Sequence, residues 1–298
     1  MRKLATPQFD ALETFDRCVE DIDDLNLQAS YSGSRANIGH ANDAFDAAGE
    51  TAAWSNLPRV PRGNPGVIVA GTLTKKNLMD LYSTNMVGTT GRSRDIYDEI
   101  LTAAGGFCPF CGGLGHVRSL DHYLPKANFP AYSVHPNNLV PCCRDCNTGK
   151  NASFGRYPHQ QTLHPYLDHD RFFSERWITA LAYPGESILV QYSCTPPITW
   201  SVNDKHRAQS HFEGYDLALR FSVQAGSEVA KVVSTRASSL RTLSPDSFRN
   251  FLLDGANSQN LVLNGWHRTM YSALANTDWF VQTDFQNPGW HLAFAPQL

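Results

Sequence analysis

The stretch that decides the fold of this chain comprises F-C-P-F-C-G-G at residues 107–113, L-D-H-Y-L-P at 120–125 and N-N-L-V-P-C-C-R-D-C-N-T-G-K at 137–150. It contains two C-x-x-C pairs, Cys108 with Cys111 and Cys143 with Cys146. Four thiolates in two such pairs can close a tetrahedral zinc site, which is a structural arrangement because no coordination position stays open. The spacing therefore predicts a core that is held together by zinc.

Polar side chains lie between the two cysteine pairs and directly after them: Asp121 with His122, then Asn138, Asn147 and Lys150. Hydrolysis of a phosphodiester needs a water that is deprotonated near neutral pH, and histidine is the side chain that titrates there. The reaction also needs charge neutralisation at the phosphoryl and leaving oxygens, which one divalent metal can supply. The set therefore predicts a single-metal nuclease site in which Lys150 contacts phosphate. A plain zinc ribbon with solvated polar residues, including a solvated Lys150 at a helix end, is the alternative.

In their order and spacing these motifs resemble the HNH endonucleases, which have a ββα-metal finger, over residues 106–152. The resemblance implies a β-hairpin followed by a helix, with Asp121 and His122 on the first strand and the last metal ligand on the helix. It also implies that His122 is the general base, that Asp121 and Asn147 bind the catalytic metal, and that Asn138 bridges the hairpin and steadies His122. Because Asn147 is a neutral oxygen donor, Mg²⁺ or Mn²⁺ suits the catalytic position better than zinc.

Other residues of this region are weaker candidates. His135 is expected to be a strand-end histidine that hydrogen-bonds to the backbone, and Cys142 a small buried residue outside the zinc site. Lys126 and Arg144 are candidates for contacts with backbone phosphates, with ordinary surface charge as the alternative. The segment H-P-Y-L-D at 164–168 is expected to form a turn with its tyrosine buried, in preference to a second metal site.

The composition is that of a globular protein, with 298 residues of which 42% are hydrophobic and 18% charged. No stretch approaches the roughly 18–20 uninterrupted apolar residues of a membrane span, and the N-terminal segment has no apolar signal core. Seven cysteines, four of them in zinc spacing, fit a reducing cytosol better than a disulfide framework. We therefore expect a cytoplasmic protein with no membrane segment.

The net charge of −3 is unevenly distributed along the chain. Residues 1–60 carry five Lys/Arg and ten Asp/Glu, so that 5 − 10 gives −5, whereas residues 106–160 carry five and two, so that 5 − 2 gives +3. The positive field is therefore local to the predicted site. A chain of this charge should bind free DNA weakly without a partner, and its acidic N-terminal region suits contact with another protein.

Hydrophobic periodicity and turn residues predict an α+β chain that is mostly helical, with a helical and irregular region over 1–92, the zinc-stapled ββα nuclease core over 93–160, and a hairpin with helices over 161–298. Helices should begin at Thr6-Pro7, Thr74 and Ser93, with residues 28–66 mostly irregular apart from a short helix near 42–48. Further on we expect a β-hairpin over 177–194, helices near 204–221, 226–239, 245–255 and 260–275, and a short strand or extended tail over 279–294.

The predicted function is a metal-dependent HNH endonuclease with a structural zinc, and double-stranded DNA is favoured over RNA or single strands as substrate. Residues 164–168 and G-W-H-R-T-M-Y-S-A-L-A at 265–275 also resemble HNH proteins of bacterial anti-phage defence loci, which implies an effector with a protein partner such as an ATPase. The alternatives are a self-sufficient, site-specific restriction-type nuclease and a non-catalytic zinc-finger module that binds nucleic acid. The Asp-His pair favours an enzyme, because a binding module gains nothing from it.

Overall fold

The computed structural model describes residues 1–88, 90–150 and 154–294. The fold is α+β and about 51% helical, and the strands of the described residues form three antiparallel two-stranded sheets. The chain divides into an N-terminal unit, Lys3–Phe110 with Gly115–His169, and a C-terminal unit, which contains Met1–Arg2, Cys111–Leu114 and the chain from Asp170 onward. Among the described residues, every helix is too short or too polar to cross a membrane.

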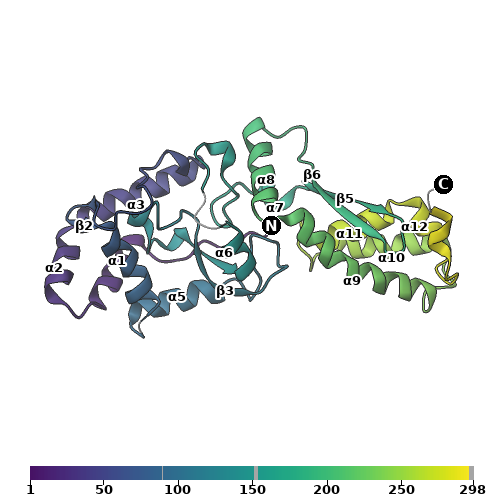
Figure 1. Cartoon of the computed structure of the whole chain (residues 1–298), viewed down its shortest axis with the longest axis horizontal. Coiled ribbons are helices and arrows are strands. Elements are labelled where there is room, and N and C mark those ends of the chain that lie inside the picture. The colour runs from purple at the N-terminus through teal and green to yellow at the C-terminus, as the bar shows by residue number, and fades with distance from the viewer. Residues whose placement is uncertain (89, 151–153, 295–298) are drawn as a thin grey trace. The chain divides into compact units, whose positions relative to one another are not determined.

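The N-terminal unit contains the elements from α1 to η5, several of which are labelled in Figure 1. In chain order they are α1 (Ala11–Glu20), α2 (Leu25–Gly33), α3 (Arg35–Glu50), η1 (Trp54–Asn56), β1 (Ile68–Ala70), β2 (Leu73–Thr74), α4 (Lys75–Asp80), the π-helical η2 (Leu81–Met86), α5 (Arg92–Thr102), β3 (Val117–His122), η3 (Pro130–Tyr132), η4 (Pro136–Asn138), β4 (Leu139–Cys143), α6 (Arg144–Lys150) and η5 (Pro158–Gln160).

The first helix begins later than its sequence predicts. Its N-cap is Asp10, whose side chain accepts a hydrogen bond from the Glu13 N–H at 2.8 Å, so α1 starts at Ala11 and not at Thr6-Pro7. Aspartate satisfies one of the free N–H groups at a helix start, and this local bond decides the boundary. The predicted starts at Thr74 and near Ser93 are confirmed by α4 and α5.

The prediction that residues 28–66 are mostly irregular is wrong for the first half of that range. Helices α2 and α3 occupy it, and α3 buries Ile38, Asn42, Phe45 and Gly49 along one side. Two of these residues are polar or small, so the buried stripe has little contrast in hydrophobicity with the rest of the helix. Packing against the unit therefore stabilises a helix that periodicity alone did not reveal. The stretch that contains the three prolines, residues 57–66, is irregular as predicted.

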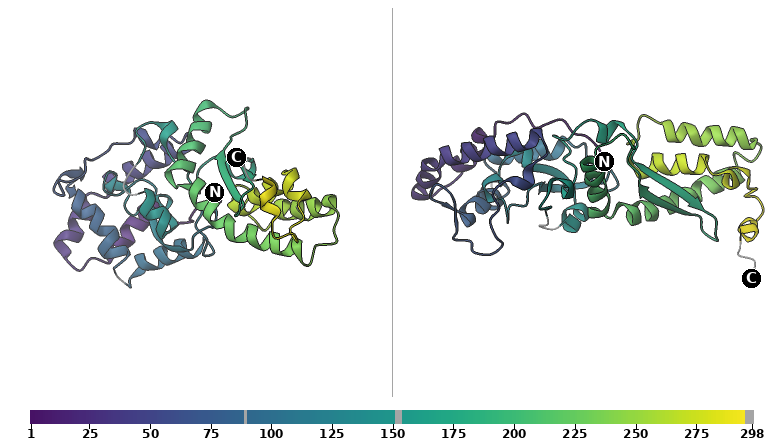
Figure 2. Two further views of the ribbon diagram at one scale, coloured as in Figure 1. Left: turned by 45° about the vertical axis from the view of Figure 1, so that its right-hand side comes forward. Right: turned by 90° about the horizontal axis from the view of Figure 1, so that it is seen from above.

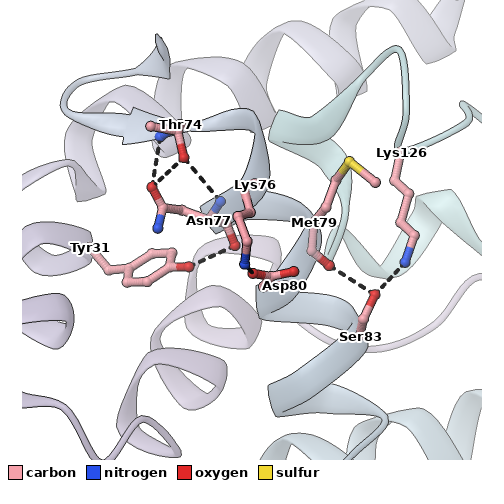
Figure 3. Close-up of polar contacts among 8 residues, drawn as sticks. All are labelled: Tyr31, Thr74, Lys76, Asn77, Met79, Asp80, Ser83 and Lys126. Atoms are coloured by element: carbon pink, nitrogen blue, oxygen red, sulfur yellow. Dashed lines mark hydrogen bonds and ion pairs between the residues drawn. The ribbon is translucent and has the colours of Figure 1, made fainter. Parts of the chain in front are cut away.

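Side-chain hydrogen bonds fix α4 and the π-helical turn that follows it (Figure 3). Thr74 and Asn77 form a reciprocal capping box at the start of α4, and the Tyr31 hydroxyl of α2 donates to the Asn77 carbonyl at 2.7 Å. At the other end, Lys126 Nζ donates to Ser83 Oγ at 2.5 Å. Lys126 belongs to the loop after β3, so this bond attaches that loop to η2. π-Helical turns are rare and occur frequently at functional sites, so the position of η2 marks a region to examine for function.

Strands β3 and β4 pair antiparallel, and β4 runs directly into α6, so the order along the chain is strand, strand, helix. Figure 1 labels β3 and α6. The register is regular from Ser119, opposite Cys142, to His122, opposite Leu139. Helix α6 packs on both strands. On the other side, Leu120 and Leu139 join the main apolar core of the unit, which gathers side chains from α1, η2 and α5. The strand pair is thus held between this core and α6.

The C-terminal unit is a hairpin with helices. Its elements are α7 (Arg171–Ser174), β5 (Ile178–Tyr183), β6 (Leu189–Cys194), α8 (Val202–Gly214), α9 (Leu217–Ala237), α10 (Pro245–Asn257), α11 (Trp266–Ala275), α12 (Asp278–Gln282) and η6 (Trp290–Phe294). The predicted hairpin over 177–194 and the helix opening at Ser244-Pro245 are confirmed. Helix α9 packs against β6, and α11 packs against β5. Figure 2 shows the ribbon from two further directions.

Three details of this unit differ from the prediction, and the first is that the helix expected near 260–275 begins at Trp266. The helices expected over 204–221 and 226–239 correspond to α8 and α9, but the break between them lies at residues 214–217. Asp216 takes a left-handed conformation with φ of 49°, which interrupts the helix at this point. The aromatic end is helical, as α12 and η6, and not a strand or extended tail. Its aromatic rings pack on one another, with Phe280 and Phe285 centroids 5.2 Å apart, so aromatic content indicated packing and not strand geometry.

Candidate functional site

The four cysteines of the two C-x-x-C pairs meet in the structure. Cys108, Cys111, Cys143 and Cys146 are all buried, and their sulfur atoms lie within 4.8 Å of one another. A tetrahedral zinc with Zn–S bonds of ~2.3 Å has S···S separations of ~3.8 Å, so this cluster fits zinc with little rearrangement. Four thiolates leave no position for water or substrate. The site can therefore bind a structural metal such as zinc.

Backbone geometry explains how each cysteine reaches the cluster. The Cys108 N–H donates to the Gly115 carbonyl at 3.0 Å, and Gly112 and Gly113 both have positive φ, which lets the chain turn sharply after Cys111. Cys143 ends β4, and Cys146 lies in the first turn of α6. Cys142 is buried, and its thiol donates to the carbonyl of the next residue at 3.3 Å. It lies outside the four-sulfur group, as the spacing predicted.

His122 lies at the end of β3 with its ring fixed on two sides. Its Nε2 lies 2.8 Å from the Ser133 carbonyl oxygen, and its ring meets the Tyr82 ring edge-on at 4.3 Å. A carbonyl only accepts hydrogen bonds, so Nε2 carries the proton and Nδ1 carries the lone pair in the neutral ring. The His122 side chain is 6% exposed, which makes it a fixed group at the edge of a packed core.

Two tyrosines form hydrogen bonds with the free edge of β3 at Leu120, two residues before His122. The Leu120 N–H donates to the Tyr97 hydroxyl at 3.3 Å, and the Tyr82 hydroxyl donates to the Leu120 carbonyl at 3.2 Å. Leu120 pairs with Pro141, so its own N–H and carbonyl point away from β4 and need other partners. Burial raises the pKa of Tyr82, which keeps its hydroxyl protonated as a donor. The strand that carries His122 is therefore bonded along both edges.

Asn138 is wholly buried and uses its amide in three hydrogen bonds. Its Oδ1 accepts from the Leu124 N–H at 2.7 Å, while its Nδ2 donates to the Leu124 carbonyl at 3.2 Å and to the Tyr132 carbonyl at 2.9 Å. These bonds close the loop between β3 and β4. The residue after Tyr132 is Ser133, whose carbonyl receives His122, so Asn138 holds in place the turn that orients the His122 ring.

Asp121 and Asn147 lie on the face of β3 that α6 covers. Asn147 Nδ2 on α6 donates to Ser119 Oγ at 3.3 Å, and Asp121 is two residues further along the strand on the same face as Ser119. Both Asp121 and Asn147 are half-buried. Because the Asn147 amide donates through nitrogen, its oxygen stays as an acceptor. Lys150 is the last residue of α6, and its side chain lies outside the described residues.

Asp121 and His122 point to opposite faces of β3, as adjacent residues of a strand must. Asp121 faces α6 with Ser119, and His122 faces Tyr82 with Leu120. A group that contacts both side chains has to lie beyond the end of the strand, where its two faces meet. The structure places Asp121 and His122 at this strand end, Asn138 in the loop between β3 and β4, and Asn147 on α6, which covers one face of the strand.

The weaker candidates divide. The prediction that the His135 ring hydrogen-bonds to the backbone is wrong, because among the described residues neither ring nitrogen has a partner with hydrogen-bond geometry. The His135 ring is buried against the Phe45 ring, with ring centroids 4.2 Å apart. Asp46 Oδ1 lies 3.5 Å from His135 Nε2. Burial lowers its pKa to about 3. Residues 164–168 form the expected turn, in which Asp168 Oδ2 accepts the His164 N–H at 2.5 Å.

The two basic candidates also have different surroundings. Lys126 Nζ lies 4.6 Å from the centre of the Tyr82 ring in addition to its bond with Ser83, and burial lowers its pKa. Arg144 is exposed in the first turn of α6. Tyr82 and Ser133 were missed by the sequence-based reasoning. They lie 40 residues before His122 and 11 after it, and no spacing rule connects residues that meet only through the tertiary fold.

Comparison with known proteins gives one relationship of substantial length. No protein-family model and no solved structure matches the chain. Over 292 residues the chain is 32% identical to protein ea31 of Escherichia phage lambda, and the alignment covers 94% of this chain and 99% of the phage protein. Such identity over nearly the full length of both proteins indicates common ancestry and a shared fold. The chain therefore belongs to the family of phage lambda protein ea31.

Proposed function

We propose that this protein is a metal-dependent endonuclease of the HNH type that hydrolyses phosphodiester bonds, with double-stranded DNA as the favoured substrate. The observation that carries the proposal is the fixed His122 ring at the end of β3, with Asp121 beside it and Asn147 across from the strand on α6. The strand, strand, helix order of β3, β4 and α6 agrees with the arrangement that the sequence resemblance implies. The buried four-cysteine cluster supports the same assignment.

His122 is the proposed general base. Its Nε2–H is bound to the Ser133 carbonyl, so the lone pair of Nδ1 is the position that accepts a proton from the attacking water. The carbonyl bond also favours the charged ring that results, since both ring nitrogens are then donors. The edge-on Tyr82 ring limits rotation of the imidazole. These contacts orient the base before substrate arrives, which reduces the entropic cost of the reaction.

Asp121 and Asn147 are the proposed ligands of a catalytic cation. A carboxylate and an amide oxygen from β3 and α6 make a hard, oxygen-only donor set, which suits Mg²⁺ or Mn²⁺ and leaves most positions to water and phosphate. Such an ion, when bound, supplies charge neutralisation at the phosphoryl and leaving oxygens. The Ser119 hydroxyl holds the Asn147 amide nitrogen and thereby aims its oxygen. The resemblance implies products with a 3′-hydroxyl and a 5′-phosphate.

The decisive experiment replaces His122 by Ala and measures cleavage of duplex DNA with added Mg²⁺ or Mn²⁺. Loss of a general base should reduce the rate by at least ~10²-fold. His116→Ala is the matched control, because His116 is an exposed histidine that precedes the same strand. The control should cut at the rate of the unaltered protein. Normal cutting by His122→Ala, in preparations that are free of contaminating nuclease, would contradict the proposed mechanism.

A further inference from the structure

An open pocket of about 730 Å³ in the N-terminal unit is lined by three arginines. Arg59 and Arg62 come from the proline-rich stretch after η1, and Arg156 comes from the segment after α6. All three side chains belong to exposed residues, and no Asp or Glu is among the described residues that line the pocket. The pocket is therefore a concentration of positive charge on a chain whose net charge is −3.

The backbone that carries Arg59 and Arg62 is held in place by side chains from other elements. The Val60 N–H donates to the Asn128 carbonyl at 2.8 Å, and Asn128 Nδ2 donates back to the Val60 carbonyl at 3.0 Å. On the other side, the buried Lys75 donates through Nζ to the Pro61 carbonyl at 2.8 Å. Because these bonds fix the residues between and beside the two arginines, the guanidinium groups are presented by a preorganised loop.

The arginines are close enough to repel one another. Burial and then the charges of Arg156 and Arg62 lower the pKa of Arg59. Arg59 also donates to the Phe154 carbonyl at 3.3 Å and lies 5.3 Å above the Phe129 ring, which hold its side chain at the pocket. Positive charges held close together repel one another, and a bound anion relieves that repulsion.

Two segments connect this pocket to the proposed nuclease site. Asn128 lies six residues after His122 in the loop that leaves β3, and Phe154 lies seven residues after Asn147. The Phe154 ring packs edge-on against Tyr123, the residue next to His122, with ring centroids 5.6 Å apart. Part of the pocket lining, namely Asn128, Phe154 and Arg156, therefore follows closely in the chain after the proposed base and the proposed ligand of the cation.

We infer that Arg59, Arg62 and Arg156 form a binding site for the phosphate backbone of duplex DNA beside the strand end that carries His122. Planar guanidinium groups bind phosphate oxygens through paired N–H donors, and an open pocket admits a continuous backbone. The inference rests on the proposed nuclease function for its choice of ligand. It goes beyond that function by assigning affinity to a site separate from the hydrolytic residues. Backbone contacts carry no sequence information, so this site contributes affinity and orientation.

The test measures binding without cleavage. A fluorescent DNA duplex is titrated with full-length His122→Ala protein in the absence of divalent metal, by anisotropy, over a series of KCl concentrations. In this background Arg59→Gln, Arg62→Gln and Arg156→Gln are combined. We expect at least a tenfold loss of affinity at low salt, and a slope of log K against log [KCl] that is shallower by roughly two to three, about 0.9 for each lost phosphate contact.

Two matched variants separate the pocket from net charge and from folding. Arg92→Gln, Lys231→Gln and Arg241→Gln together remove the same charge from exposed positions outside the pocket and should leave the slope nearly unchanged. The triple Arg-to-Lys variant of the pocket should retain most of the slope, because the charge is kept. An equal loss in the two Gln triples, or no DNA binding by the unsubstituted pocket, would overturn the inference.

Other outcomes distinguish this site from the proposed function. Saturable binding of inorganic phosphate at the pocket with no binding of DNA would overturn the assignment to a backbone and indicate a site for a small anion. Binding that depends on the three arginines in a protein that cuts no DNA would keep the site and refute the nuclease proposal. Cleavage that persists with unaltered DNA affinity in the pocket triple would refute the site and keep the nuclease.

Discussion

Replacement of Asn138 by Ala should strongly destabilise the N-terminal unit. The change leaves the buried N–H and carbonyl of Leu124 without their partner. It also removes one of two donors to the Tyr132 carbonyl, which keeps the His135 N–H at 3.3 Å. Leu124 is 0% exposed and Tyr132 is 3% exposed, so water cannot readily replace the amide. Each orphaned group costs about 1–3 kcal/mol. Because neighbouring losses are not additive, we expect a decrease of ~3–5 kcal/mol in the free energy of unfolding.

The measurement is hydrogen–deuterium exchange together with urea unfolding, because the two units need not unfold together. Protection of residues 120–143 should decrease most. Asn138→Leu, which keeps the volume and removes the hydrogen bonds, should be destabilised to a similar degree. Asn26→Ala is the control, since Asn26 is exposed on α2 of the same unit and its change should cost less than ~0.5 kcal/mol. A loss below ~1 kcal/mol in Asn138→Ala would refute the assigned role of these bonds.

Three further predictions concern metal, pH and partners. Purified protein should contain close to one tightly bound zinc per chain by elemental analysis, and Cys108→Ser should lower both zinc content and thermal stability; unchanged values would contradict the zinc assignment. The pKa of His135 is depressed to about 3, so its neutral form stabilises the fold above pH 6.5, and that contribution should be lost as the pH falls toward 3; His135→Gln should flatten this part of the stability profile, and an unaltered profile would contradict it. Native protein should co-purify from its own host with a partner such as an ATPase, and the double variant Asp43→Asn, Glu50→Gln, at exposed positions of α3, should recover less of that partner. A monomer or homodimer that cuts a defined site efficiently at physiological salt would favour a restriction-type enzyme.

The partner experiment uses substitutions because a deletion of residues 1–60 would disrupt the fold. This region has the strongest acidic excess of the sequence, but it also supplies Phe15, Phe45 and Trp54, all of which are fully or almost fully buried in the N-terminal unit. Most of its acidic residues are therefore exposed at the surface of a packed unit. Substitution of exposed carboxylates tests the charge without removing the core.

Local signals in the sequence predicted the parts of the fold that depend on neighbouring residues. Thr74 begins α4, Ser244-Pro245 begins α10, and the hairpin over 177–194 has its two strands on either side of the expected turn. In each case the deciding interaction is a cap or a turn that spans a few residues. The largest error, the missed length of α2 and α3, falls where distant packing decides. Helix α3 is stabilised by burial of Phe45 among residues from other elements, and a short-range pattern contains no record of that contact.

The same distinction applies to the candidate site. The spacing of Cys108, Cys111, Cys143 and Cys146 identified the metal cluster, because ligand geometry restricts spacing along the chain. The positions that orient His122 were not predictable in this way. Ser133 acts through its carbonyl oxygen, which any residue has, and Tyr82 approaches from a π-helical turn 40 residues earlier. A backbone acceptor leaves no signature in side-chain identity, so only the tertiary structure reveals it.

The cysteine cluster and the proposed hydrolytic residues are mechanically linked through short stretches of chain. Cys146 directly precedes Asn147 in α6, and Cys142, next to Cys143, pairs with Ser119, which bonds to Asn147. A metal bound by the four sulfurs therefore fixes α6 against β3, and with it the distance between Asn147 and Asp121. Because the cysteine cluster is buried and the proposed oxygen ligands are half-buried, a chelator should remove the proposed catalytic cation long before the structural metal. Activity lost at that early stage should return when Mg²⁺ is added, whereas activity lost with the zinc should not return with Mg²⁺ alone.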